Sequence, residues 1–205
     1  MPQKRNTNKA SNTRLAIIDT AETLVIEGGM DSLTLDAIAS ECGITVQTIY
    51  NRVGGRAAIL IAIAERALED NRQYMDAAYA RSGSAYERML AVSEGYARFA
   101  AEKPYAFRLM ANPPQEPQAL ERITQLVQKH NSQLMQVIKD GIKAGEIRTD
   151  IDPFQTATAI WAAANGLLSL NWRADGNAMT QGQFADILQT GIKVVMDGLF
   201  RPKSN

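Results

Sequence analysis

The spacing of the apolar residues is the feature that most constrains the fold of this 205-residue chain. Apolar residues recur with the period of an amphipathic helix from one end of the chain to the other. No segment shows the sustained alternation of apolar and polar residues that is typical of a strand. With 45% hydrophobic and 21% charged residues, the chain can bury a core without disulfides or metals. The sequence therefore predicts an all-α protein of about nine helices.

The composition also excludes several classes of protein. A single cysteine, Cys42, and a single histidine, His130, leave no cluster at the spacing of a metal site. We expect Cys42 to fill space in a turn and His130 to lie on the flank of a helix. The apolar run at 57–64 is too short to span a membrane, and the basic N-terminus does not resemble a signal peptide. We therefore expect a cytoplasmic protein without metal, cofactor or enzyme activity.

The distribution of charge sets the N-terminus apart, although the net charge is zero. Residues 1–14 carry four cations and no acid, and we expect residues 1–11, with Lys4 and Arg5, to form a disordered basic arm. Residues 15–60 carry six acids against two arginines, Arg52 and Arg56. A polyanion would therefore meet the arm and these two arginines. The alternative for the arm is a solubilising tail.

Residues 35–53 predict two short helices joined by a tight turn. Gly43 allows the turn, and Ile38 and Ile49 are among the apolar residues that pack such helices at a steep angle. The second helix leaves a polar set facing outward: Thr45, Gln47, Thr48, Tyr50, Asn51 and Arg52. Amides can read an adenine edge with two hydrogen bonds, and hydroxyls suit phosphates. The pattern is typical of a DNA-binding helix-turn-helix, although similar hairpins occur in proteins that never bind DNA.

The same region resembles the DNA-binding domain of the tetracycline-repressor (TetR) family. The resemblance is carried, in order and spacing, by 17–24 (IIDTAETL), Gly28-Gly29, 33–39 (LTLDAIA), 42–45 (CGIT), 48–50 (TIY), Arg56 and Leu60. It implies that the second short helix enters the major groove of double-stranded DNA and that Thr34, Tyr50 and Arg56 contact phosphates. It also implies a DNA-binding domain at 12–55 and a ligand-binding and dimerisation domain at 56–205.

The C-terminal two thirds is similar to one branch of this family, whose regulatory domain carries a Trp, three residues and then His-Gly. Here Trp161 is followed at that spacing by Asn165 and Gly166, so an amide replaces the His. Aromatic residues and one amide suit a ligand cavity, and a plain core is the alternative. The expected cavity residues are Tyr74, Phe99, Tyr105, Phe107, Met110, Trp161, Asn165 and Trp172. They predict a small, mostly apolar and uncharged ligand.

Two C-terminal helices carry more apolar and small residues than a single helix contact needs. Small residues lie opposite Trp161 and would let another helix approach closely. We therefore expect a homodimer formed by two helices from each subunit, whereas a core within one subunit is the alternative. The expected interface residues are Ala163, Gly166, Leu170, Phe184, Leu188 and Val195.

Together these patterns predict a sequence-specific, DNA-binding transcriptional regulator. We expect a repressor that leaves a palindromic operator when a small-molecule inducer binds. The alternative is a dimeric ligand- or protein-binding module of the same fold with no role in transcription. It is supported by the acidic residues of the DNA-binding domain and by Val53, which stands where the family commonly has an aromatic residue.

Overall fold

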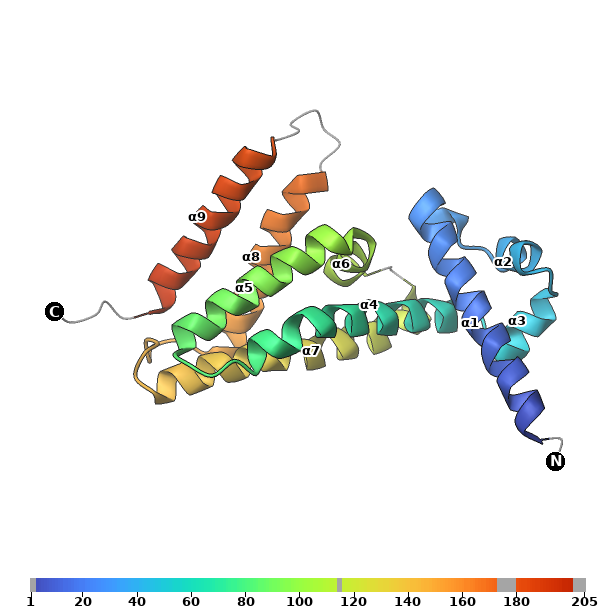
Figure 1. Cartoon of the computed structure of the whole chain (residues 1–205), viewed down its shortest axis with the longest axis horizontal. Coiled ribbons are helices and arrows are strands. Elements are labelled where there is room, and N and C mark those ends of the chain that lie inside the picture. The colour runs from blue at the N-terminus through green and yellow to red at the C-terminus, as the bar shows by residue number, and fades with distance from the viewer. Residues whose placement is uncertain (1–2, 114–115, 173–179, 201–205) are drawn as a thin grey trace. The chain divides into compact units, whose positions relative to one another are not determined.

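The computed structural model describes residues 3–113, 116–172 and 180–200; for residues 3–9, 130 and 172 it describes the backbone only. Its elements are helical, which confirms the all-α prediction (Figure 1). In chain order they are α1 Gln3–Gly28, η1 Met30–Ser32, α2 Leu35–Cys42, α3 Val46–Arg52, α4 Arg56–Tyr79, α5 Ala85–Glu102, α6 Pro104–Ala111, α7 Pro117–Lys143, α8 Pro153–Ser169, η2 Leu170–Trp172 and α9 Gln181–Leu199. Within the described ranges, no helix is long and apolar enough to cross a membrane.

Local side-chain bonds fix the starts of several helices. Thr34, Thr45 and Asp152 each accept a hydrogen bond from the backbone N–H three residues further on, at 3.1, 3.2 and 2.8 Å. These bonds satisfy amide groups that the start of a helix leaves without partners. Gly43 ends α2 with a φ of 61°, the left-handed backbone that the tight turn before α3 requires.

The N-terminal segment differs from the prediction. Residues 3–11, expected to form a disordered arm, belong to α1. No Gly or Pro interrupts the sequence between Gln3 and Glu27, and its Lys, Arg, Gln and Ala residues favour a helix. Near the C-terminus, α8 ends at Ser169. The Ser169 hydroxyl donates back to the Gly166 carbonyl at 2.8 Å, a bond that competes with the helical pattern.

The chain forms two compact units, which we call unit 1 and unit 2. Unit 1 comprises Met1–Ala67 and Asn112–Gln125, and unit 2 comprises Leu68–Ala111 and Leu126–Asn205. The division falls inside α4 and α7 and not at residue 55, because the first half of α4 supplies buried residues such as Leu60 to unit 1. Both helices therefore contribute to both units.

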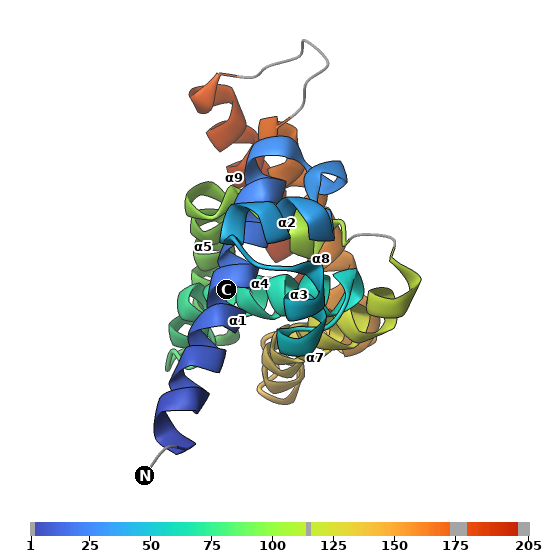
Figure 2. The ribbon, with the colours of Figure 1, turned by 90° about the vertical axis from the view of Figure 1, so that its right-hand side faces the viewer.

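In unit 1, α1, α2 and α3 pack against one another (Figure 2). Their fully buried side chains include Ile17, Ile38 and Ile49, and each such burial contributes about 1.5–3 kcal/mol to stability. Ile49 is the buried residue of α3. The helix is therefore attached through one side and is free to present its polar side chains on the other.

In unit 2, α4, α5, α7, α8 and α9 share one apolar cluster. Its most buried members are Met75, Met89, Val137, Ile138 and Ile147. Gly141 of α7 allows close packing there, because a Cβ at this position would lie 2.7 Å from the Ala85 Cβ and 2.6 Å from the Ile147 Cδ1. On the same unit, α8 and α9 lie side by side (Figure 1).

Candidate DNA-binding and ligand-binding sites

The outer face of α3 carries the amides that the sequence selected for base recognition. Gln47 and Asn51 are exposed, and the Gln47 Nε2 donates to the Asn51 Oδ1 at 3.2 Å. Arg52 is exposed beside them, and Tyr50 is 53% exposed. The bond between the two amides aligns them along the helix, and each amide keeps hydrogen-bonding capacity for another partner. The arrangement suits contact with base edges.

The threonine hydroxyls near α3 already make hydrogen bonds within the protein, but each can form further ones. The Thr45 hydroxyl accepts from the Thr48 backbone and lies 2.9 Å from the Thr48 hydroxyl. The exposed Thr34 hydroxyl accepts from the Ala37 backbone N–H. A hydroxyl that accepts such a capping bond still has a proton to donate. Thr34 can therefore cap α2 and donate to a phosphate at the same time.

Arg56, the first residue of α4, is held by three partners in unit 1. Its guanidinium pairs with the Glu116 carboxylate and donates to the carbonyls of Leu33 and Met30 at 3.2 and 3.4 Å. These bonds connect α4 to η1 and to the residue that precedes α7. The sequence missed Glu116 because it lies sixty residues away, in a segment without a functional pattern. Arg56 has a structural role, and its expected phosphate contact must share this guanidinium.

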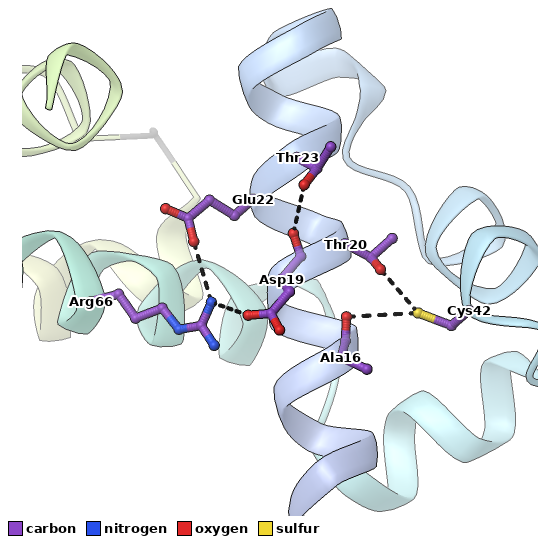
Figure 3. A network of polar contacts seen from close by, with 7 residues as sticks. All are labelled: Ala16, Asp19, Thr20, Glu22, Thr23, Cys42 and Arg66. Atoms are coloured by element: carbon purple, nitrogen blue, oxygen red, sulfur yellow. Dashed lines mark hydrogen bonds and ion pairs between the residues drawn. The ribbon is translucent and has the colours of Figure 1, made fainter.

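Part of the acidic charge of unit 1 is paired with a cation of the same unit (Figure 3). Arg66 of α4 lies 2.6 Å from the Asp19 carboxylate and 3.2 Å from the Glu22 carboxylate, both on α1. In the sequence analysis these two acids supported the alternative function, a module of the same fold with no role in transcription. Because they pair with a cation, they oppose a polyanion less than the count of charges suggested.

Cys42 connects α2 to α1 through polar contacts (Figure 3). Its thiol donates to the Thr20 hydroxyl at 3.2 Å and lies 3.8 Å from the Ala16 carbonyl. The side chain is half-buried and its sulfur is free of any disulfide. Cys42 therefore has a structural role, but it is half-buried and bonded to α1 and does not simply fill space in the turn as expected.

An aromatic cluster lies in unit 2 where the sequence expected a ligand pocket. The ring centroids of Tyr74 and Phe99 are 5.7 Å apart, those of Tyr96 and Phe99 are 6.1 Å apart, and those of Tyr96 and Phe107 are 5.8 Å apart. Phe99, Phe107 and Met110 are buried, with at most 3% of each residue exposed. These three residues therefore lie in the core, and Tyr105 on α6 is half-buried.

Tyr74 belongs to the edge of this cluster. Its hydroxyl donates to the Glu102 carboxylate at 2.7 Å, which raises the pKa of the phenol. The guanidinium carbon of Arg98 lies 5.3 Å from the centre of its ring, a cation–π arrangement. Tyr74 and Arg98 border a polar hollow of about 320 Å³ between α4 and α5.

A separate, apolar cavity of about 60 Å³ lies between α5, α8 and α9, and we call it the α5–α8–α9 cavity. Ala163, Leu188 and Val195, which were expected at a dimer interface, line this cavity within the subunit together with Tyr96. They do so because the inward-facing side of α9 packs toward α5 and α8. None of the seven described residues that the sequence selected for a ligand pocket lines it.

Polar groups meet beside this cavity. The Tyr96 hydroxyl donates to the Asn165 Oδ1 at 2.7 Å, across sixty-nine residues of sequence. Burial raises the pKa of the Tyr96 phenol, whereas the nearby indole N–H of Trp161 acts in the opposite direction. That indole nitrogen is itself buried, and its geometry falls short of a regular hydrogen bond. Trp161 and Asn165 were predicted from the sequence as site residues, whereas Tyr96 was not. The side chain of Trp172 lies outside the described residues.

Other apolar residues of α8 and α9 remain exposed. Phe154 is 62% exposed, Ile187 36% and Val194 67%. A Cβ at Gly166 would meet nothing within 4 Å, so another helix has room to approach there. Of the remaining residues expected at a dimer interface, Leu170 and Phe184 are half-buried.

A short polar helix held by one buried isoleucine, and joined to a second helical unit, defines the class of helix-turn-helix proteins with an all-helical C-terminal domain. Residues 17–63 match the family described as bacterial regulatory proteins, tetR family. Residues 89–194 match the tetracyclin repressor-like C-terminal domain. The chain therefore belongs to the tetracycline-repressor family of helix-turn-helix transcriptional regulators.

Relatives of known sequence or structure agree with this assignment. The chain is 26% identical over 155 residues to the uncharacterized HTH-type transcriptional regulator YdeS of Bacillus subtilis, covering 74% of this chain and 76% of that protein. A TetR/AcrR-family regulator from Thermobifida fusca superposes with a TM-score of 0.68 at 22% identity, over 93% and 100% of the two chains. FadR from Bacillus subtilis, solved in complex with stearoyl-CoA, gives a TM-score of 0.73 at 16% identity, over 90% and 98%. The two solved structures support the fold alone.

Proposed function

We propose that this regulator is a repressor that binds a palindromic operator as a homodimer and leaves it when a small, mostly apolar ligand binds unit 2. The observation that carries this proposal is the outer face of α3, where exposed amides stand on a helix anchored by Ile49. A dimer would present two such helices to successive half-sites of the operator. The protein then needs no catalytic group and no cofactor.

We assign base recognition to Gln47 and Asn51, with Thr45, Thr48 and Arg52 beside them. Thr34, Tyr50 and Arg56 are assigned to phosphates. Support comes from the exposure of these residues on or near α3, Arg56 being partly exposed. Lys4 and Arg5 are assigned to phosphates or to the adjacent minor groove because of their charge, although their side chains lie outside the described residues.

The proposed dimer uses the exposed side of α8 and α9. Ile187 and Val194 are spaced by two helical turns on α9, and Gly166 of α8 leaves space for a partner helix. Exposed apolar side chains on one face mark an interaction surface. This choice replaces Leu188 and Val195, which line the α5–α8–α9 cavity, as the main contacts.

The proposed ligand site is the α5–α8–α9 cavity with the polar groups of Tyr96 and Asn165 beside it. The lining of the cavity is almost wholly apolar and includes no charged side chain, which favours an uncharged ligand. Trp161, Asn165 and Gly166 occupy the positions of the Trp-x3-His-Gly branch of the family, and we place the chain in that branch with an amide in place of the His. FadR was solved with an acyl-CoA, so this fold can hold an apolar chain.

The DNA-binding half of the proposal is tested with labelled duplexes from the regions that flank the protein's own gene. Fluorescence anisotropy should detect a specific duplex that the dimer prefers over unrelated DNA. Gln47→Ala should relax the preference at particular base pairs, at a cost of about 1–3 kcal/mol of discrimination. Gln133→Ala, which truncates an exposed glutamine of α7, is the matched control and should leave the preference unchanged. Equal behaviour of the two variants would contradict the assignment of Gln47.

A further inference from the structure

Three polar side chains lie close together in unit 2, and we call them the Trp161–Tyr96–Asn165 cluster. Its firm bond runs from the Tyr96 hydroxyl to the Asn165 Oδ1, at 2.7 Å. The buried indole N–H of Trp161, one helical turn before Asn165 on α8, lies beside the same hydroxyl. The Tyr96 ring packs on Phe99 and Phe107, so the cluster is embedded among apolar rings.

The chemistry of these groups fixes the direction of the cluster. An indole N–H can only donate, so the Tyr96 oxygen is the one group of this pair that could accept, although the Trp161 nitrogen makes no regular hydrogen bond in the structure. Burial keeps the pKa of Tyr96 raised, so the phenol retains its proton and donates it to the Asn165 Oδ1. The reverse orientation of the amide would direct a second donor at the hydroxyl and leave the phenol proton without an acceptor. Asn165 is therefore left with its Nδ2 group, a donor, at the free end.

The free end of the cluster lies beside the α5–α8–α9 cavity, which Asn165 itself does not line. Asn165 is half-buried, and its Nδ2 group has no hydrogen-bond partner among the described residues. Ala164 and Leu167, its neighbours on α8, both line the α5–α8–α9 cavity, as does Tyr96. A ligand oxygen that reached the Nδ2 group would gain a hydrogen bond from it, while the apolar remainder of the ligand would occupy the cavity. Because no charged side chain lines the cavity, a carboxylate would bury its charge without a counter-ion.

We propose that Asn165 selects neutral ligands that carry a carbonyl oxygen, such as ketones, esters or amides, over hydrocarbons and carboxylates of the same length. This inference rests on the proposed function and names the ligand class of the same site. Tyr96 acts as a positioning residue, because it holds the Asn165 amide with its donor outward. An alkylammonium ion, which has donors and no acceptor, would place its protons against those of the amide and be rejected.

The test uses methyl ketones, n-alkanes and fatty carboxylates of matched chain length as probes. Their binding is followed by tryptophan fluorescence and by calorimetry, and their effect on operator binding by anisotropy of a labelled duplex. The ketone should bind more tightly than the carboxylate. Asn165→Leu should weaken the binding of the ketone by about 2- to 10-fold, which is the affinity equivalent of one neutral hydrogen bond. The binding of the alkane should be unchanged or tighter.

Two further variants separate the possible failures. Asn165→Asp keeps an acceptor for the Tyr96 hydroxyl but removes the donor, so it should weaken the ketone and admit the alkylammonium ion. Tyr96→Phe should weaken the ketone less than Asn165→Leu does, because the amide stays but loses its support. If ketone and alkane respond equally to Asn165→Leu while both still release the operator, the carbonyl assignment is overturned and the proposed function stands. If no probe binds or releases the operator, the proposed function fails together with this inference.

Discussion

Removal of one negative charge, at Glu116, should raise the affinity for DNA while it lowers the stability of the protein. The Glu116 carboxylate pairs with the Arg56 guanidinium, which is also assigned to a DNA phosphate. In the operator complex the phosphate must compete with this carboxylate for the same cation. Glu116→Gln keeps the size of the side chain and removes the competing charge, so Arg56 becomes more available to the phosphate.

The size of the effect follows from the exposure of the pair. The side chains of Arg56 and Glu116 are 37% and 27% exposed, and ion pairs with such access to water contribute about 0.2–1 kcal/mol. Freeing Arg56 should therefore raise the DNA affinity of each DNA-binding domain by about 1.4- to 5-fold, and that of a dimer with two domains by about 2- to 25-fold. The free energy of unfolding should fall by about 0.2–1 kcal/mol per subunit, since the same pair stabilises unit 1.

Operator anisotropy and urea unfolding measure the two quantities on one preparation. Glu121→Gln is the matched control, because Glu121 carries the same charge in unit 1 and bonds to Gln125 and not to a cation. The gain in affinity should also vanish when Arg56→Ala is combined with Glu116→Gln, as in a double-mutant cycle. A gain of equal size in the Glu121 variant, or one that survives the loss of Arg56, would refute competition for the guanidinium.

Two other predictions follow from exposure and burial in unit 2. Val194→Glu should split the dimer and leave the subunit folded, because Val194 is exposed, whereas Leu188→Glu should lower stability by placing a charge at the apolar cavity. Sedimentation measures the first effect and thermal unfolding the second. An intact Val194→Glu dimer would place the interface elsewhere. Burial raises the pKa of Tyr79 above its usual value of 10.0, so its proton stabilises the fold below about pH 10 and this contribution is lost as the pH rises further. Tyr79→Phe should flatten the alkaline loss of stability in urea unfolding, and an unchanged pH profile would contradict this origin.

The sequence predicted best what depends on neighbouring residues. The turn at Gly43 needs only one residue with a left-handed backbone, so its position was predicted correctly. The bond of Tyr96 to Asn165 joins two helices far apart in sequence, and no local pattern indicated it. The side of α9 that faces inward was likewise missed, since Leu188 and its outward neighbours are equally apolar and only packing distinguishes them.

The Arg56–Glu116 pair also bears on how ligand binding can reach the DNA. Arg56 is the first residue of α4, and Glu116 directly precedes α7, and both helices continue from unit 1 into unit 2. The α5–α8–α9 cavity has no lining residue on α4 or α7, so a ligand there would change the free energy of this pair only if its binding also favoured one arrangement of these two helices. The pair is worth about 0.4–2 kcal/mol per dimer, while allosteric coupling between sites is typically about 1–3 kcal/mol. This one contact can thus supply a large share of the coupling, and Glu116→Gln should reduce the response of operator binding to ligand as well as raise the affinity without it.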